Sequence, residues 1–143
     1  MKKILIYSIL SVLLISCDQI KQYQNYRLDG MWQLKTVQDQ YGNIIPVDTI
    51  FYSFQRELIF SFTVLENSKV ALSPVYGYVD MPSDHQVHVS IDEQAAGDYE
   101  FQRFLSLSGW SSADIVFEIK KYNTSDLVLF DQEYEKTYTL KKF

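Results

Sequence analysis

Cysteine is almost absent from this sequence, which has one such residue, Cys17, among 143. A single cysteine excludes a disulfide within the chain and any Cys-x-x-Cys redox or zinc motif. Histidine is also scarce, and two residues leave few general bases for a catalytic triad. The sequence has neither a Gly-rich phosphate-binding loop nor the Gly-x-Ser-x-Gly elbow of serine hydrolases. These absences argue against an enzyme, and no cofactor is predicted.

Basic residues are outnumbered by acidic residues. The chain has 13 Lys and Arg against 18 Asp and Glu. Two lysines lie at positions 2 and 3, so residues 17–143 carry 11 basic and 18 acidic residues, a formal net charge of −7 (11 − 18). An acidic surface repels phosphate, which argues against nucleic-acid binding. It argues equally against electrostatic attachment to anionic lipid.

The N-terminus contains the one long apolar run. Lys2 and Lys3 precede an apolar stretch from Ile4 to Leu14, and Cys17 comes shortly after it. A basic start followed by a short apolar run is typical of a secretory signal peptide and is too short to cross a bilayer. Leu14-Ile15-Ser16-Cys17 resembles a bacterial lipobox, which implies cleavage before Cys17 and acylation of its thiol. An ordinary signal peptide with an incidental cysteine is the alternative.

Three segments follow from this reading. Residues 1–16 are predicted to be a lipoprotein signal peptide, residues 17–28 a lipidated tether, and residues 29–143 a single domain. The membrane partner would be reached through acylated Cys17, and the predicted location is the bacterial cell envelope.

The rest of the chain alternates between apolar and polar residues and is rich in aromatics, with nine Phe and eleven Tyr. This pattern is typical of half-buried strands. It predicts strands at 31–37, 49–55, 58–65, 70–80, 86–91, 115–120, 127–130 and 138–141. Gly77 is expected to mark a bulge. Between Asp98 and Gly109 the apolar spacing is helical instead, with Asp98 as the N-cap.

Short turns between these strands predict an antiparallel meander, and closure into a ring removes both exposed edges. The predicted fold class is therefore all-β: an up-and-down barrel of about eight strands with one short helix near residues 98–109. A two-sheet sandwich is the alternative.

The start of the first strand and the last strand carry a family resemblance. Gly30 and Trp32, together with the closing Tyr138 and Leu140, resemble the lipocalin-like lipoproteins of Bacteroidetes, which have a calycin-like β-barrel. In the wider lipocalin superfamily, a tryptophan packs at the closed end of the barrel and a basic residue of the last strand lies over it. The resemblance implies this role for Trp32, with Lys141 or Lys142 above it. It implies a fold more than an activity.

An aromatic stripe is the candidate site, and it would either fill the core or line a cavity for a small apolar ligand. Its members are Tyr52, Phe54, Phe60, Phe62, Tyr76 and Tyr78. Trp110, in the loop after the predicted helix, is added to this set and is expected to matter less for stability than Trp32. His85 and His88 lie three apart on the predicted strand and so point to opposite faces, which predicts no metal site.

Three function hypotheses remain. The first is a non-catalytic envelope lipoprotein that binds a small apolar ligand inside the barrel, with the helix as a lid. The second is a filled barrel that acts as a protein–protein interaction module for a partner protein of the envelope. The third is an envelope hydrolase.

Overall fold

The computed structural model of this chain describes residues 28–55, 58–63 and 75–143, with the backbone alone described for 58–63. The predicted signal peptide, Cys17 and all but the last residue of the tether lie outside these ranges. Residues 64–65 and 70–74 of two predicted strands lie outside them as well. Within the described ranges, no helix has the length and apolar character that crossing a membrane would require.

The described residues form nine strands and two helices. They are β1 (Gly30–Gln38), β2 (Ile44–Pro46), β3 (Ile50–Gln55), β4 (Leu58–Thr63), β5 (Val75–Ser83), β6 (Gln86–Ile91), α3 (Glu93–Ala96), α4 (Asp98–Ser108), β7 (Asp114–Tyr122), β8 (Asp126–Asp131) and β9 (Lys136–Lys142). The single-turn helix α3 was not predicted.

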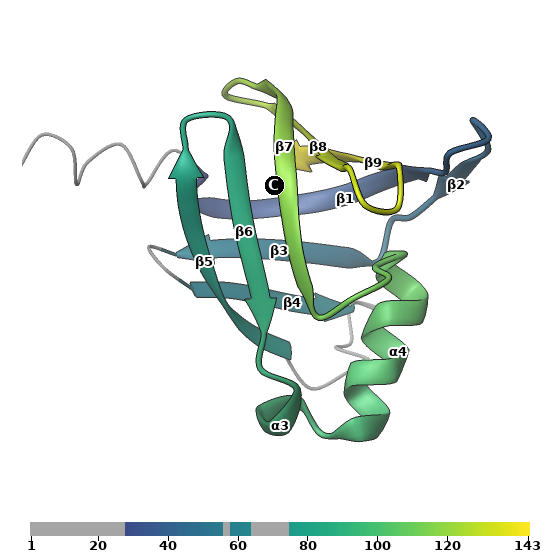
Figure 1. Cartoon of the computed structure of the whole chain (residues 1–143), viewed down its shortest axis with the longest axis vertical. Helices are drawn as coiled ribbons and strands as arrows, with labels where there is room; N and C mark the ends of the chain where they lie inside the picture. The colour runs from purple at the N-terminus through teal and green to yellow at the C-terminus, as the bar shows by residue number, and fades with distance from the viewer. Residues whose placement is uncertain (1–27, 56–57, 64–74) are drawn as a thin grey trace, which may run out of the picture.

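All the strands belong to one antiparallel sheet, in the order β2-β1-β3-β4-β5-β6-β7-β8-β9, and β1 also pairs with β9. The pairings therefore run in a ring through eight strands, while β2 pairs only with the end of β1. Figure 1 shows β1, β3 and β4 running across the view and β5, β6 and β7 along it. The predicted up-and-down barrel with a helix near residues 98–109 is confirmed.

Side chains alternate between the interior and the surface along β6, β8 and the start of β1, and a register shift within β1 changes the phase. In β1, Trp32 and Leu34 are buried, as the alternation predicted. The register with β9 shifts between Leu34 and Thr36, however, so Val37 rather than Thr36 is the next buried residue. A bulge adds one residue to one strand of a pair, which moves all later side chains to the opposite face.

The predicted inward face of β5 is wrong. Tyr76 and Tyr78 are 43% and 62% exposed, whereas Val75 and Val79 are buried. Gly77 pairs regularly with its neighbours on both sides, and the register shift comes instead between Asp80 and Ser83. Both faces of this strand carry large or apolar residues, so alternation alone could not choose between them.

One end of the barrel is built on Trp32, which is 1% exposed. Its indole N–H donates to the carbonyl of Leu28 at 2.8 Å. The Lys142 ammonium lies 4.4 Å from the centre of the Trp32 ring and donates to the carbonyl of Asp29. A Cβ on Gly30 would lie 2.2 Å from the Lys142 nitrogen, and Gly30 has φ +117°. Glycine is therefore required where the lysine crosses the first strand, and Lys142 is the basic residue that the resemblance implied.

The helix α4 lies at the other end of β1 from Trp32 (Figure 1). Gly109 ends the helix with φ +74° and lies against Val37. The helix starts after Gly97, with φ +75°, and no side chain caps its N-terminus. Asp98 is thus the first helical residue and not the predicted N-cap. Phe101, Phe104 and Ser108 form the buried face of α4.

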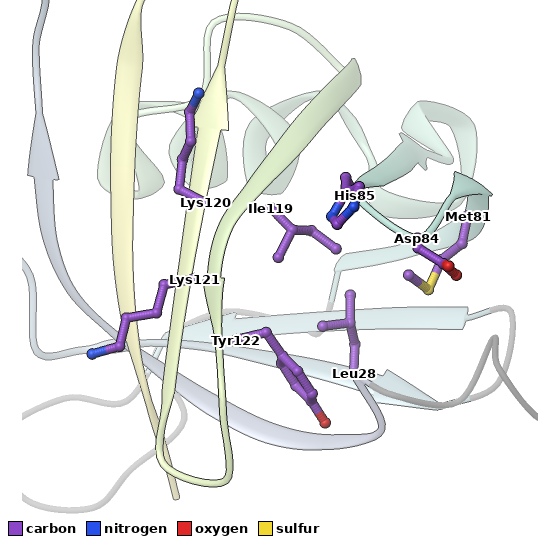
Figure 2. A pocket seen from close by; sticks show the side chains of 8 residues that line it. All are labelled: Leu28, Met81, Asp84, His85, Ile119, Lys120, Lys121 and Tyr122. Atoms are coloured by element: carbon purple, nitrogen blue, oxygen red, sulfur yellow. The ribbon is translucent and has the colours of Figure 1, made fainter.

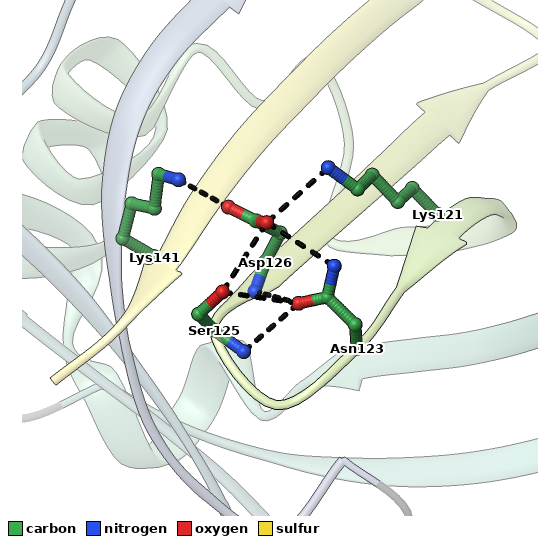
Figure 3. Close-up of polar contacts among 5 residues, drawn as sticks. All are labelled: Lys121, Asn123, Ser125, Asp126 and Lys141. Atoms are coloured by element: carbon green, nitrogen blue, oxygen red, sulfur yellow. Dashed lines mark hydrogen bonds and ion pairs between the residues drawn. The ribbon is translucent and has the colours of Figure 1, made fainter.

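A polar network at the β7–β8 turn ties the turn to β9 (Figure 3). The Asp126 carboxylate accepts from Lys141 and, at 3.2 Å, from both Lys121 and the Asn123 side chain. The Asn123 side-chain oxygen in turn accepts from the backbone N–H groups of Ser125 and Asp126, at 2.9 and 2.7 Å. Lys141 therefore does not lie over Trp32. The hydrogen bond from Lys141, followed by those from Asn123 and Lys121, holds the pKa of Asp126 well below its usual value.

The contacts around Trp32 predict that two variants at this end of the barrel are less stable than a variant at an exposed control position. Trp32→Ala should lower the free energy of unfolding by ~3–5 kcal/mol through lost burial and the cavity left behind. Lys142→Met keeps the aliphatic part of the side chain but removes the charge, and it should lower the free energy of unfolding by about 0.5–2 kcal/mol. Tyr41→Ala removes a ring that is 81% exposed and should change almost nothing. Urea unfolding measures all three, and an equal small loss in Trp32→Ala and Tyr41→Ala would contradict this structure.

The Asp126 network predicts a pH dependence. The folded-state pKa of Asp126 lies below the unfolded value, so its contribution is present at neutral pH and is lost as the pH falls below about 4. Asp126→Asn should therefore lower the urea midpoint at pH 7, and its difference from wild type should narrow as the pH is lowered from 4. Asp48→Asn breaks a single exposed ion pair with Lys35, so it should lower the urea midpoint at pH 7 by less than Asp126→Asn does. A pH-independent difference for Asp126→Asn would refute the assignment.

Candidate ligand-binding site

A run of aromatic rings occupies the interior under α4. The Trp110 ring lies 5.7 Å from Tyr52, 5.2 Å from Phe104 and 5.5 Å from Phe117, measured between ring centres. Phe117 continues to Tyr138 at 5.4 Å. All four contacts are edge-on, with interplanar angles between 62° and 80°, which is the favoured geometry for paired aromatic rings. Strands β3, β7 and β9, the helix and the following loop thus converge on one apolar site.

The site contains a buried hydrogen bond between two of these rings. The Trp110 indole N–H donates to the Tyr52 hydroxyl at 2.6 Å. Burial, and then the neighbouring Tyr138, raise the pKa of Tyr52 well above its usual value of 10.0, so the hydroxyl keeps its proton. Within the described part of the chain this hydroxyl accepts one bond and donates none. Tyr52 therefore presents an O–H donor inside an apolar site.

A second set of polar contacts fixes the loop that follows α4. The Tyr138 hydroxyl and the Lys136 ammonium both donate to the carbonyl of Gly109, at 3.0 and 2.8 Å. The same ammonium donates to the Ser111 hydroxyl at 2.7 Å. Burial and the nearby Asp131 carboxylate raise the pKa of Tyr138. The loop that carries Trp110 is thereby attached to β9 and not to the helix alone.

The predicted ligand-lining set is only partly brought together. Tyr52, Phe54 and Trp110 are buried in the core, and Trp110 is only 4% exposed although it lies in a loop. That its truncation costs less stability than the truncation of Trp32 stays a prediction. Tyr76 and Tyr78 lie on the outer surface and are removed from the set. The register pairs Phe60 with Tyr76 and Phe62 with Phe51, so these two positions are not in phase with Tyr52 and Phe54.

Some residues of the site were missed at the sequence level. Phe104 was expected on a helix face, yet its contact with Trp110 depends on how α4 packs against the barrel. Phe117 and Tyr138 are fully buried beside these rings but were not in the predicted ligand-lining set. No local signal could join Trp110 to Tyr52, because 58 positions separate them.

A small hollow lies at the opposite end of the barrel (Figure 2). Its volume is about 260 Å³, and it is lined by Leu28, Met81, Asp84, His85, Ile119, Lys120, Lys121 and Tyr122. Figure 2 shows the ends of Lys120 and Lys121 directed away from the hollow. Both are engaged elsewhere, with Glu118 and Asp126. The hollow near Trp32 thus has a mixed polar and apolar lining, without the cluster of aromatic rings found at the α4 end.

The two histidines lie apart. His88 contacts Asp114, with 2.7 Å between its Nε2 atom and a carboxylate oxygen, whereas His85 lies in the turn before β6 and not on the strand. Among the described residues, no three His, Cys, Asp or Glu side chains are grouped so as to hold a metal ion.

Known proteins resemble this chain in sequence and in structure. A family model described as a lipocalin-like domain matches residues 12–143. A lipocalin-like protein from Bacteroides uniformis has a similar crystal structure, with TM-score 0.67 and 20% identity over 82% of this chain and 99% of its own. An uncharacterized protein from Bacteroides eggerthii is similar at TM-score 0.65 and 19% identity, over 80% of this chain and 98% of its own. No curated protein sequence matches the chain.

Proposed function

Because this chain belongs to the lipocalin-like domain family, we propose that it binds a small apolar molecule inside its barrel, under α4, and performs no catalysis. The observation that carries this proposal is the Tyr52–Trp110 pair. Ligand sites are mostly apolar and contain a few well-placed polar groups. Here an O–H group that donates to none of the described residues lies in a cluster of aromatic rings, which suits a flat apolar molecule with one hydrogen-bond acceptor.

The helix α4 provides a route into this site. It covers the end of the barrel through a few buried side chains and is bounded by Gly97 and Gly109, which both have positive φ. Glycine adopts many backbone conformations at little cost, so the helix can move at its Gly97 end, while its Gly109 end stays held by Tyr138 and Lys136. Movement of α4 would displace Phe104 from Trp110 and open the aromatic site.

A filled barrel that binds partner proteins is the second candidate, and the edge-on ring contacts support it. Rings at 5.2 to 5.7 Å already satisfy one another without a ligand. The two candidates differ in one measurable respect: only the first requires an apolar molecule to reach Trp110.

Ligand binding predicts a response of Trp110 to an apolar probe. In a Trp32→Phe variant, Trp110 is the remaining tryptophan. Titration with N-phenyl-1-naphthylamine should quench its emission saturably, with energy transfer to the probe. Of two competitors of equal size, 2-acetylnaphthalene should displace the probe about fivefold better than 2-ethylnaphthalene, because only the ketone accepts a hydrogen bond from Tyr52.

Two controls sharpen this test. Tyr52→Phe should abolish the preference for the ketone, while Tyr41→Phe, at an exposed position, should leave it unchanged. Absence of saturable quenching would refute the ligand site and favour the filled barrel. Saturable binding with no ketone preference in wild type would refute the role of Tyr52.

We further propose that the domain acts at the bacterial cell envelope, where acyl chains on Cys17 anchor it in the membrane. The lipobox-like Leu14-Ile15-Ser16-Cys17 sequence supports this. Each buried CH₂ of an acyl chain contributes ~0.8 kcal/mol, so two or more chains hold a protein stably.

An acyl anchor on Cys17 predicts that a variant without the thiol is found in a different cell fraction from the wild-type protein. Cys17→Ser should move the protein from the membrane fraction to the soluble fraction and leave its melting temperature unchanged, since Cys17 precedes the barrel. Ser16→Thr keeps the thiol and should stay in the membrane fraction. A Cys17→Ser protein that remains membrane-bound after its signal peptide is removed would rule out the lipid anchor.

A further inference from the structure

A shallow hollow lies on the outer face of β5 and β6, the side away from the aromatic site. Its volume is about 350 Å³, and its lining includes Tyr78, Asp80, His88 and Ser90. The strand register places Tyr78 opposite Ser90 and Asp80 opposite His88, so these four side chains share one face of the sheet. The Tyr78 ring is 62% exposed. A large aromatic ring and a carboxylate are thus offered to solvent side by side.

A second hollow, of about 240 Å³, lies on the neighbouring strands. It is lined by Gln86, Asp114, Val116, Glu118, Asp131, Gln132 and Glu133. The strands β6 and β7 lie side by side (Figure 1). Ser90 pairs with Asp114 and His88 with Val116, so the two hollows adjoin across these strands.

The lining of the two hollows is strongly acidic. Their described lining residues include five Asp or Glu side chains and no Lys or Arg. Lys120 touches this face only at its margin, through an ion pair with Glu118 at 2.7 Å. Other lysines are engaged elsewhere: Lys142 lies over Trp32, and Lys121 and Lys141 bind Asp126. These three lysines are therefore occupied by contacts outside the two hollows.

This chemistry selects a cation. A cation over the face of an exposed tyrosine is attracted by the ring, and a nearby carboxylate adds a charge-assisted hydrogen bond. A neutral partner would desolvate the carboxylates without compensation, and an anionic partner would be repelled. The formal charge of −7 on residues 17–143 attracts a basic partner over distance.

From this arrangement we propose that the outer face of β5, β6 and β7 binds a basic, extended segment of a partner protein. One arginine or lysine side chain lies over Tyr78 beside Asp80, and a second reaches Asp114 and Glu118. A small cation would fill one hollow, whereas a chain with basic residues at intervals reaches both. This surface is separate from the proposed ligand site under α4.

The test uses a fluorescein-labelled octapeptide of alternating arginine and glycine, followed by fluorescence anisotropy at low ionic strength. The peptide should bind wild-type protein saturably, and the same peptide with citrulline in place of arginine should not bind. Asp80→Asn and Tyr78→Ala should each weaken binding about fivefold.

Matched controls separate a site from general charge attraction. Asp84→Asn changes the net charge as much as Asp80→Asn but lies in the turn before β6, and Tyr41→Ala removes an exposed tyrosine ring elsewhere. Both control variants should weaken peptide binding by much less than the roughly fivefold loss expected of Asp80→Asn and Tyr78→Ala. The proposal would be overturned if Asp84→Asn weakened peptide binding as much as Asp80→Asn, or if Tyr78→Ala did not weaken it. It would also be overturned if the arginine peptide did not bind wild-type protein, or if the citrulline peptide did. Probe binding at Trp110 should be unaffected by these variants, so this test fails or succeeds independently of the ligand site.

Discussion

The pairing of β1 with β9, which places Lys142 over Trp32, is the constraint on which the rest of the barrel depends. The ammonium lies over the indole ring and also bonds the carbonyl of Asp29, in space that exists only because residue 30 is glycine. The last strand is thereby attached to the first at the point where β1 also begins its pairing with β3. Since that double pairing joins the sheet into a ring, it leaves neither β1 nor β9 as an open edge.

The two ends of the barrel differ physically, and this difference indicates where a ligand would enter. At the Trp32 end, the indole donates to the Leu28 carbonyl, lies under the Lys142 ammonium of the last strand and has the Tyr122 ring 6.1 Å from its own. At the other end, a single helix between two glycines covers the rings of Tyr52, Trp110 and Phe117. An end held by many different contacts is rigid, whereas an end covered by one element can open as a unit.

The fold could be predicted from the sequence because apolar residues recur at every second position in the strands and at helical spacing between residues 98 and 109. Trp32, Tyr52 and Phe54 were therefore assigned to the interior correctly. The face of β5 could not be predicted, because tyrosines on one side and valines on the other both satisfy an apolar pattern. The choice depends on the register with β4 and β6, which is set by the whole sheet.

The candidate site was predictable only in part, for a similar reason. The shift between Leu34 and Thr36 that buries Val37 leaves no signal in the residues themselves. The choice of Lys142 over Lys141 depends on which of two adjacent side chains faces the indole and which faces Asp126. Long-range pairs such as Tyr52 with Trp110 exist only once the ring of strands is formed.

The central claim is that the barrel holds a small molecule against Tyr52 and Trp110. Native mass spectrometry of protein purified from its own host tests it most directly. We expect the native protein to show the additional mass of one small molecule, which is lost on denaturation. Protein carrying both Tyr52→Phe and Trp110→Ala should lack this additional mass. A spectrum of wild-type protein at the mass of the lipidated chain alone, or a co-purified protein and no small molecule, would contradict it.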